Sequence, residues 1–304
     1  MYTINRIKKF KNIAAFAYDL GGAEHLYSFI NKSPLLNKKK ISFFFNGPSS
    51  KLIKEKNKLI KDISAENLSE FDLILSSTST GNFEKKVFSI ANEKKIEIWA
   101  ILDHWTNYDN RFEYSKKLFL PNLVLVTDQF ALQRFKQIFP NTEVEKIENY
   151  FLNKIRSKMK VQKKKNSILY FSEPEMNFRL KSPRLKSLDV GNLEWINAQK
   201  KFLIKEIKFI RDSNFFEKNK NLKLIIRLHP KLHGIVDENF VFKEFIERKN
   251  TELADALLTA HTCIGKSSYA LYISTELGIP TYTISQQIYG KSRQTLPFEI
   301  KELI

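Results

Sequence analysis

Short apolar segments alternate with amphipathic segments along most of the chain. A continuous apolar run indicates a strand buried on both faces, whereas apolar positions three and four residues apart indicate one face of a helix. The predicted strands are residues 13–18, 41–45, 73–75, 96–102, 123–126, 168–171, 224–227, 262–264 and 281–284. The predicted helices are residues 23–31, 50–60, 84–92, 129–138, 193–211, 240–247, 252–259 and 268–277. This alternation predicts parallel sheets with right-handed crossovers, the doubly wound α/β class.

A strongly basic segment with little periodicity, residues 154–166, interrupts the alternation. A chain of 304 residues is long enough for two domains that each bury a core of their own. We therefore predict two Rossmann-like domains, residues 1–160 and residues 161–304, that face each other across a cleft. Ligands of open α/β sheets bind at the carboxyl ends of the strands, so polar residues at strand ends are the candidates for a site.

Three strand ends of the second domain carry polar residues. Ser172 and Glu173 follow one strand, Arg227, His229 and Pro230 end the next, and Gly265, Lys266, Ser267 and Ser268 join a third strand to a helix. Because the free amides and the dipole of a helix start favour phosphate, we predict a nucleotide-phosphate site here. By spacing alone, His229 is as compatible with a strand cap as with a ligand contact. Ala260 stands where a P-loop has its first glycine, which argues against an NTPase.

Two strand ends of the first domain are also candidates. Asp19, Gly21 and Gly22 form a strand-to-helix loop that a ligand can approach closely, but the G-x-G-x-x-G spacing is absent and a plain tight turn explains the loop equally well. Asp103, His104, Trp105 and Arg111 form a polar and aromatic cluster, with Asp103 a candidate general base and Trp105 a candidate platform for a sugar ring. The alternative is that Trp105 and Phe112 belong to the core and that Asp103 caps a helix. Residues 76–81, rich in hydroxyls, are expected to form a turn.

The composition adds a strong positive charge. The formal net charge is +18, which is compatible with nucleic acid, an anionic membrane surface or a phosphorylated substrate as partner. No aromatic-basic RNA motif or zinc spacing is present, so nucleic acid is the weakest of the three expectations. The single cysteine, Cys263, lies in an apolar segment and is expected to be a buried structural thiol. Without a membrane-spanning run or a signal peptide, we expect a cytoplasmic protein, held where needed at the inner face of an anionic membrane.

Two motifs of the second domain carry a family resemblance. His229-Pro230 ends a strand, and Ser267-Ser268 begins a helix within a pattern that includes Gly265, Glu276, Gly278 and Pro280. Residues 167–285 thereby resemble the nucleotide-binding domain of GT-B glycosyltransferases, particularly bacterial enzymes of capsule and lipooligosaccharide synthesis that use CMP-activated sialic acid or Kdo. The same short motifs occur in polyol-phosphate polymerases of teichoic acid synthesis. The acidic D/E-D/E-G triplet of bacterial sialyltransferases is absent, so Asp103 is its substitute by position only.

The resemblance implies a glycosyltransferase without metal or other cofactor. It would move a sugar, a CMP-activated nonulosonate such as sialic acid or Kdo, onto a glycan or a lipid-linked acceptor. His229 would stabilise the donor phosphate and Asp103 would take the acceptor proton. The nucleotide would be bound by Ser172, Glu173, Arg227, Pro230, Gly265, Lys266, Ser267, Ser268 and Glu276, and the acceptor by Asp19, Gly21, Gly22, His104, Trp105 and Arg111. The alternatives are a CDP-glycerol or polyol-phosphate transferase, and a non-catalytic binder of anionic membrane or nucleic acid. Fixed charge on Arg227 and Lys266 would favour a UDP or CDP donor.

Overall fold

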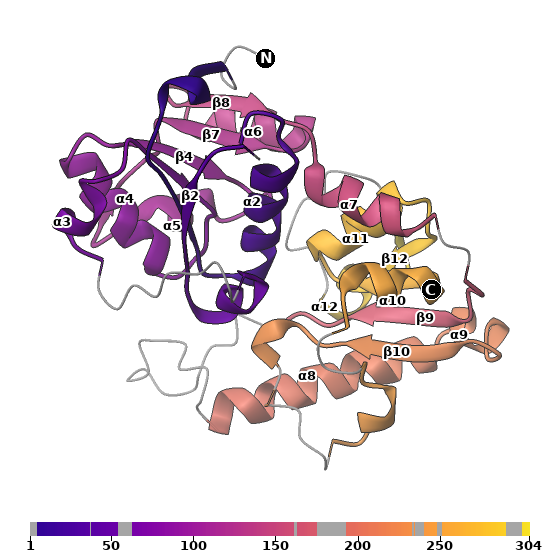
Figure 1. Ribbon diagram of the computed structural model, residues 1–304. Coiled ribbons are helices and arrows are strands. Elements are labelled where there is room, and N and C mark those ends of the chain that lie inside the picture. Colours follow the sequence, from indigo (N-terminus) through magenta and orange to yellow (C-terminus); the bar gives the residue numbers. More distant parts are fainter. Residues whose placement is uncertain are drawn as a thin grey trace. The chain divides into compact units, whose positions relative to one another are not determined.

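The computed structural model describes residues 5–36, 38–53, 63–160, 163–174, 193–232, 234, 240–247, 251–289 and 300–304. The chain divides into two compact units, Met1–Lys154 and Ile155–Ile304. The division falls inside helix α7 (Tyr150–Lys158), close to the boundary expected at residue 160 (Figure 1).

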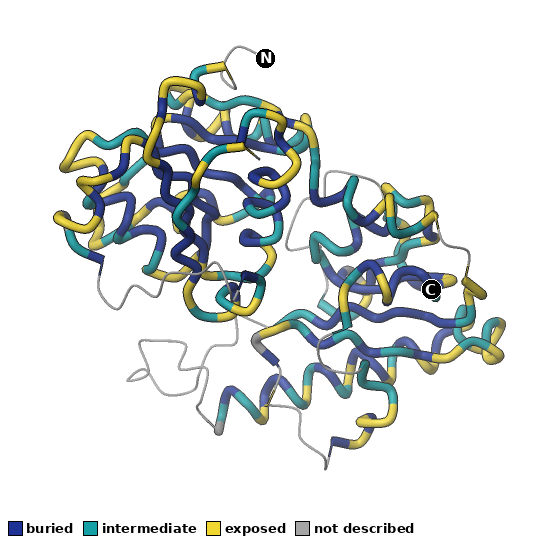
Figure 2. Tube along the Cα trace, viewed as in Figure 1, coloured by how far each residue is buried: buried dark blue, intermediate teal, exposed yellow. Residues whose placement is uncertain are grey.

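The first unit is built on a six-stranded sheet. Its strands are β1 (Ile13–Ala17), β2 (Ile41–Phe45), β3 (Leu73–Ser76), β4 (Glu97–Ile101), β7 (Leu123–Val126) and β8 (Glu143–Lys146). They lie in the order β2-β1-β3-β4-β7-β8, and all neighbours pair in parallel. The strands β1, β3 and β7 are buried along their whole length, which explains their continuous apolar sequences (Figure 2). The strand order reverses direction between β1 and β3, and this switch point is where doubly wound sheets bind ligands.

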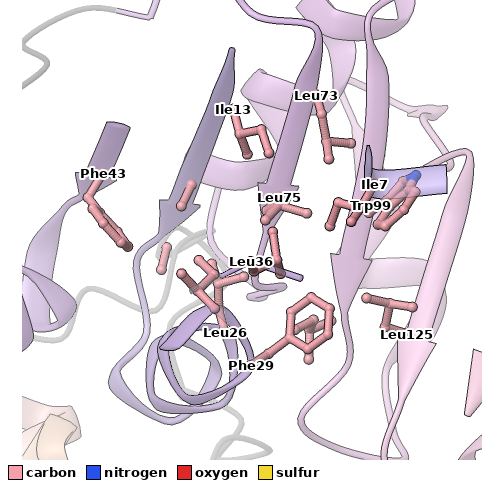
Figure 3. Close-up of a cluster of buried hydrophobic side chains, with 14 of the residues drawn as sticks. Ile7, Ile13, Leu26, Phe29, Leu36, Phe43, Leu73, Leu75, Trp99 and Leu125 are labelled. Carbon is pink, nitrogen blue, oxygen red and sulfur yellow. The ribbon is translucent and has the colours of Figure 1, made fainter. Parts of the chain in front are cut away.

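Helices connect these strands and cover the sheet. They are α2 (Leu20–Lys32), α3 (Ala65–Leu68), α4 (Phe83–Glu93), α5 (Tyr108–Phe112), α6 (Gln129–Ile138) and the 3-10 helices η1 (Ile7–Lys9) and η2 (Gly47–Ile53). A small hairpin, β5 (Glu113–Tyr114) and β6 (Lys117–Leu118), follows α5. Leu26 and Phe29 of α2 belong to the same buried cluster as Leu73, Leu75 and Trp99 of the sheet (Figure 3). This packing fixes α2, and therefore its first turn, against the strands.

The second unit repeats this layout with five parallel strands. They are β9 (Ser167–Phe171), β10 (Lys223–Arg227), β11 (Ala260–Gly265), β12 (Thr281–Thr283) and β13 (Lys301–Glu302), in the order β10-β9-β11-β12-β13. The helices are α8 (Leu193–Arg211), α9 (Asn214–Lys218), α10 (Leu253–Thr259), α11 (Tyr269–Glu276), α12 (Ser285–Tyr289), η3 (Pro230–Leu232) and η4 (Lys243–Phe245). Ile207 and Ile210 of α8 pack with Ile168, Leu224 and Ile226 in the core. The switch point of this sheet lies between β9 and β11.

Most of the predicted elements are confirmed, and β2, β7, α6 and α8 have the predicted bounds. The helix predicted over residues 240–247 is wrong: only the single 3-10 turn η4 forms, and Ile246 then pairs in parallel with Ile226 of β10. Of the region predicted as a helix at 50–60, residues 50–53 belong to η2, and residues 54–60 lie outside the described part. The elements β8, α7 and β13 were not predicted.

Within the described residues, no helix combines the length and the apolar character that crossing a bilayer requires. Cys263 is buried in β11, and burial raises the pKa of its thiol to about 12, as expected for a structural cysteine.

Candidate functional site

Asp103 and Arg111 form an ion pair at the carboxyl edge of the first sheet. Asp103 follows β4, and the chain then turns at Asn107, whose φ of 58° lies in the left-handed region that Asn tolerates. The turn starts α5 and returns Arg111 to the strand end, where its Nη1 donates to Asp103 Oδ1 at 2.9 Å. The same Nη1 donates to Thr78 O at 3.1 Å and Thr78 Oγ1 at 2.8 Å, and Nε donates to Thr106 O at 3.1 Å. Arg111 therefore ties the end of β3 to the end of β4.

The surroundings of Asp103 keep its carboxylate charged. Burial raises the pKa of Asp103, but Arg111, His25 and His104 outweigh burial and hold the pKa below its ordinary value. An ideal Cβ placed on Gly21 would lie 3.4 Å from Asp103 Oδ2, whereas Arg111 donates to the other carboxylate oxygen, Oδ1. Three predicted site residues, Asp103, Arg111 and Gly21, are thus brought together.

The first turn of α2 packs closely on the end of β3. An ideal Cβ on Gly22 would lie 2.9 Å from Ser77 Cβ, so no side chain fits at this position without a shift. One turn further along α2, His25 is 5% exposed and its ring lies 4.9 Å from that of Phe151. Burial lowers the pKa of His25 to about 4, with a smaller opposing effect from Asp103, so its imidazole is neutral at neutral pH. Nothing in the sequence marks His25 as a site residue, because it occupies a buried position of an ordinary amphipathic helix.

A buried carboxylate, Glu84, organises the neighbouring loop. Glu84 Oε1 accepts hydrogen bonds from the amide of Tyr18 at 2.9 Å and from Ser77 Oγ at 3.0 Å, and Oε2 accepts from Ser79 Oγ at 2.6 Å. Burial raises the pKa of Glu84, and the nearby Asp19 adds to the rise. Two hydroxyls of residues 76–81, a segment expected to be a simple turn, therefore donate to this buried carboxylate, those of Ser77 and Ser79.

The remaining predicted acceptor residues are placed differently. Trp105 is 1% exposed and its Nε1 donates to Asp128 Oδ2 at 2.9 Å, so it belongs to the core together with Phe112 and offers no face for a sugar ring. The alternative interpretation of the cluster is therefore confirmed for Trp105 and Phe112, but its helix cap is wrong, because Asn107 rather than Asp103 is the N-cap of α5. His104 is half-buried, and its Nδ1 lies 3.0 Å from Thr106 Oγ1. Asp19 occupies the N-cap position of α2, although its side chain makes no capping hydrogen bond.

In the second unit, the loop that leads from β11 into α11 already holds an anion, the carboxylate of Glu173. Its Oε1 accepts hydrogen bonds from the amides of Lys266, Ser267 and Ser268 at 3.1, 2.7 and 2.8 Å. Its Oε2 accepts from Ser267 Oγ at 2.9 Å. Ser268 Oγ instead caps α11 by accepting from the amide of Ala270 at 3.1 Å. The groups expected to bind a phosphate are therefore brought together as predicted, and in this structure they bind Glu173.

Lys266 points into the unit rather than toward a ligand. Its Nζ lies 2.9 Å from Glu206 Oε1 of α8 and donates to the Glu173 carbonyl oxygen at 2.7 Å. Glu206 also accepts hydrogen bonds from Tyr170 Oη at 2.5 Å and from Tyr289 Oη. Lys266 and Glu206 are 8% and 1% exposed. Sequence alone could not reveal this buried network, since Glu206 lies in the middle of a helix far from any predicted motif.

Arg227 is the last residue of β10 and His229 comes two residues later, and the two side chains have different surroundings. Arg227 forms an ion pair with Glu247, a residue the sequence analysis did not single out. The amide of His229 donates to the buried Ser172 Oγ at 3.0 Å, which ties the end of β10 to the end of β9. His229 is half-buried, and the exposed Pro230 begins η3 directly after it.

Glu276 lies apart from the other predicted nucleotide-binding residues. It is the last residue of α11, about 12 Å along the helix axis from Ser268 at 1.5 Å per residue. Its Oε2 pairs with Arg156 Nη2 at 3.0 Å on the surface. The structure therefore contradicts a role for Glu276 beside Ser267 and Ser268, because a helix that starts at the carboxyl edge ends near the opposite edge. Gly265 is buried, and an ideal Cβ there would lie 3.3 Å from the Leu271 side chain, so this glycine serves helix packing.

A cavity of about 620 Å³ lies beside β10 and α10. Leu169, Ile225 and Phe245 form part of its apolar wall, and Glu247 and Asp255 add carboxylates. None of the predicted nucleotide-binding residues is among the described residues that line it. Over the described ranges, no group of three or more His, Cys, Asp or Glu side chains is placed to hold a metal ion.

Solved structures share this architecture. The UDP-GlcNAc 2-epimerase of Methanocaldococcus jannaschii, in complex with UDP-GlcNAc and UDP, has a TM-score of 0.59 at 11% identity, covering 90% of this chain and 83% of that chain. The wall teichoic acid polymerase TagF has a TM-score of 0.50 at 12% identity, covering 96% and 77%. The fold is of the GT-B type. The UDP-GlcNAc 2-epimerase of Neisseria meningitidis, bound to UDP-GlcNAc, agrees, with a TM-score of 0.53 at 11% identity over 90% and 82%.

The GT-B type similarity confirms the predicted class of two Rossmann-like, doubly wound domains. At these identities it is a similarity of fold. No protein-family model and no curated protein matches the sequence.

Proposed function

We propose that this protein is a glycosyltransferase that moves a sugar from a nucleotide donor to a glycan or a lipid-linked acceptor. The observation that carries the proposal is a GT-B type fold with polar groups at the switch point of both sheets. The second unit would bind the nucleotide at the ends of β9, β10 and β11, and the first unit would bind the acceptor around Asp103. Similar structures that contain UDP-GlcNAc or UDP support a nucleotide sugar as the ligand.

The donor in this proposal is a CMP-activated nonulosonate such as sialic acid or Kdo. Arg227 and Lys266, the two cations that would suit a diphosphate, are paired with Glu247 and Glu206. A CMP-linked donor has a single phosphate and needs less positive charge. The half-buried His229 would donate to this phosphate and stabilise the negative charge that grows as CMP leaves.

Asp103 is the proposed partner of the acceptor hydroxyl. Because Arg111 keeps it ionised, Asp103 can accept a hydrogen bond at neutral pH through Oδ2, which lies against Gly21. It would take the proton of the hydroxyl as the new glycosidic bond forms. The same ion pair makes Asp103 a weaker base than an isolated carboxylate, so the reaction requires a donor whose leaving group departs readily.

The first experiment offers CMP-sialic acid, CMP-Kdo, CDP-glycerol and UDP-GlcNAc together with candidate acceptors and measures release of the nucleotide. Release of CMP that depends on the acceptor is the expected result. If only UDP-GlcNAc is consumed, or is epimerised without an acceptor, the CMP donor is excluded.

The second experiment replaces the proposed catalytic groups. His229→Ala should reduce kcat about 10²–10³-fold, as loss of one oxyanion donor does. Asp103→Asn should reduce it about 10²–10⁴-fold, as loss of a general base does. His261→Ala is a matched control, because His261 is an exposed histidine of the same unit. Full turnover by folded His229→Ala would overturn the mechanism.

A polyol-phosphate transferase is the second candidate, supported by the fold similarity to TagF. Consumption of CDP-glycerol in the same panel would identify it. Peripheral binding to an anionic membrane belongs to either proposal, because the net charge of +18 would attract acidic lipids. If none of the donors binds while anionic vesicles do, a non-catalytic binder is the better description.

A further inference from the structure

Three positively polarised groups in the described part of the carboxyl edge of the second sheet are engaged by carboxylates of the same unit. The backbone amides of Lys266, Ser267 and Ser268, which lead into α11, bind Glu173. Lys266 is paired with Glu206, and Arg227 is paired with Glu247. These three groups are the ones that the sequence offered to a diphosphate, and all three are neutralised internally.

Glu173 differs from the other two carboxylates in its position. It occupies the amides of Lys266, Ser267 and the N-cap residue Ser268, which lead into α11 and lie at the positive end of the helix dipole, where anions are favoured. Four hydrogen bonds hold its carboxylate there. The residue is half-buried, so its negative charge reaches the surface of the edge. A phosphate that approached these three amides would meet a carboxylate already bound to them.

We infer that Glu173 determines nucleotide specificity by excluding a second phosphate, which restricts the site to donors built on a nucleoside monophosphate. The inference rests on the proposed function, since it requires a nucleotide at this edge of the sheet. A single phosphate can be met by His229 without disturbing Glu173. A diphosphate either lies close to the Glu173 charge or displaces it from its four hydrogen bonds, and both weaken binding.

The test compares the dissociation constants of CMP and CDP, because these probes differ only in the second phosphate. Glu173→Gln removes the charge and keeps the shape and one oxygen that can accept from the α11 amides. We expect CDP binding to improve about tenfold relative to CMP, as expected when a like charge a few ångströms away is removed in a partly exposed site. Glu276→Gln is the matched control, since it removes the same charge at the other end of α11 and should leave the ratio unchanged.

Isothermal titration calorimetry at fixed ionic strength measures both constants, and circular dichroism verifies the fold of each variant. An unchanged ratio in Glu173→Gln overturns the inference. So does wild-type protein that binds CDP tenfold more tightly than CMP, a measurement that needs no variant. If wild-type protein binds neither nucleotide but Glu173→Gln binds CDP, the result supports exclusion of a diphosphate by Glu173 and rejects the proposal of a CMP-linked donor. If no form binds either nucleotide, both are rejected.

Discussion

Replacing Arg111 by methionine tests whether the ion pair holds the first sheet edge together. The substitution keeps much of the apolar stem and removes the guanidinium, which makes four hydrogen bonds. Asp103 and Arg111 have side chains that are only 20% and 10% exposed, so water replaces these contacts poorly. Removing one partner of a buried pair typically costs about 3–5 kcal/mol. We expect about 3 kcal/mol here, because Asp103 retains some contact with water.

The loss should depend on pH in a defined direction. In the wild-type protein the pKa of Asp103 is below its ordinary value, so its contribution to stability is present above that ordinary value and disappears as pH falls through the folded pKa. In Arg111→Met, burial is no longer outweighed by the guanidinium, so Asp103 is destabilising when ionised and is relieved by protonation. The difference in unfolding free energy between the two proteins should therefore be largest at neutral pH and should shrink toward acid.

Urea unfolding at pH 7 and at pH 5, followed by tryptophan fluorescence, measures this difference. Trp99 and Trp105 report on the first unit, and a Trp195→Phe background removes the signal of the second. Glu143→Gln is the control, since its pair with Arg6 in the same unit has side chains 49% and 33% exposed and should contribute little. A loss below about 1 kcal/mol, as for surface pairs, or a loss that grows toward acid, would refute the reasoning.

Two further predictions concern α2. Gly22→Ala should destabilise the protein by about 1–3 kcal/mol, because the added methyl would lie 2.9 Å from Ser77 Cβ. Gly21→Ala should be tolerated, since the nearest atom to its added methyl would be 3.4 Å away. Thermal unfolding of both variants measures the difference, and equal melting temperatures would contradict the prediction. His25 should titrate near pH 4 in NMR spectra of the folded protein. Because the pKa of His25 is 6.5 in the unfolded chain, the unfolded chain binds more protons than the folded protein between pH 4 and pH 6.5, and the unfolding free energy should fall as the pH drops through this range. Titration of His25 near pH 6.5 would show that its ring is not buried as described.

The sequence predicted the sheets well because their strands are buried on both faces and therefore read as uninterrupted apolar runs. The segment at residues 240–247 was misread because its apolar residues have helical spacing, yet Ile246 gains a backbone partner at the edge of β10 that only the tertiary fold provides. The strand β8 has the sequence Glu-Val-Glu-Lys, which is too polar to show the continuous apolar run by which the other strands were predicted.

The candidate site was predictable only in part. Strand ends could be located, since the carboxyl edge of a parallel sheet follows from the order of the elements. The partners of the charged residues could not, because Glu206 and Glu247 reach Lys266 and Arg227 from other elements. The sequence motifs therefore suggested that Lys266 and Arg227 bind a ligand, whereas in the folded protein both are paired with carboxylates of the same unit. Trp105 was misplaced for a similar reason, since only packing decides whether a tryptophan after a strand faces solvent.

The buried network around Glu206 constrains how this sequence can diverge. Replacing Glu206 alone would leave the buried Lys266 ammonium without a carboxylate partner and would remove the acceptor of two tyrosine hydroxyls, those of Tyr170 and Tyr289. Replacing Lys266 alone would leave an unpaired carboxylate, whereas exchanging the pair for apolar residues of similar volume is often tolerated. In an evolutionary lineage these positions should therefore be inherited together or lost together, because every single-step intermediate is less stable than either end point.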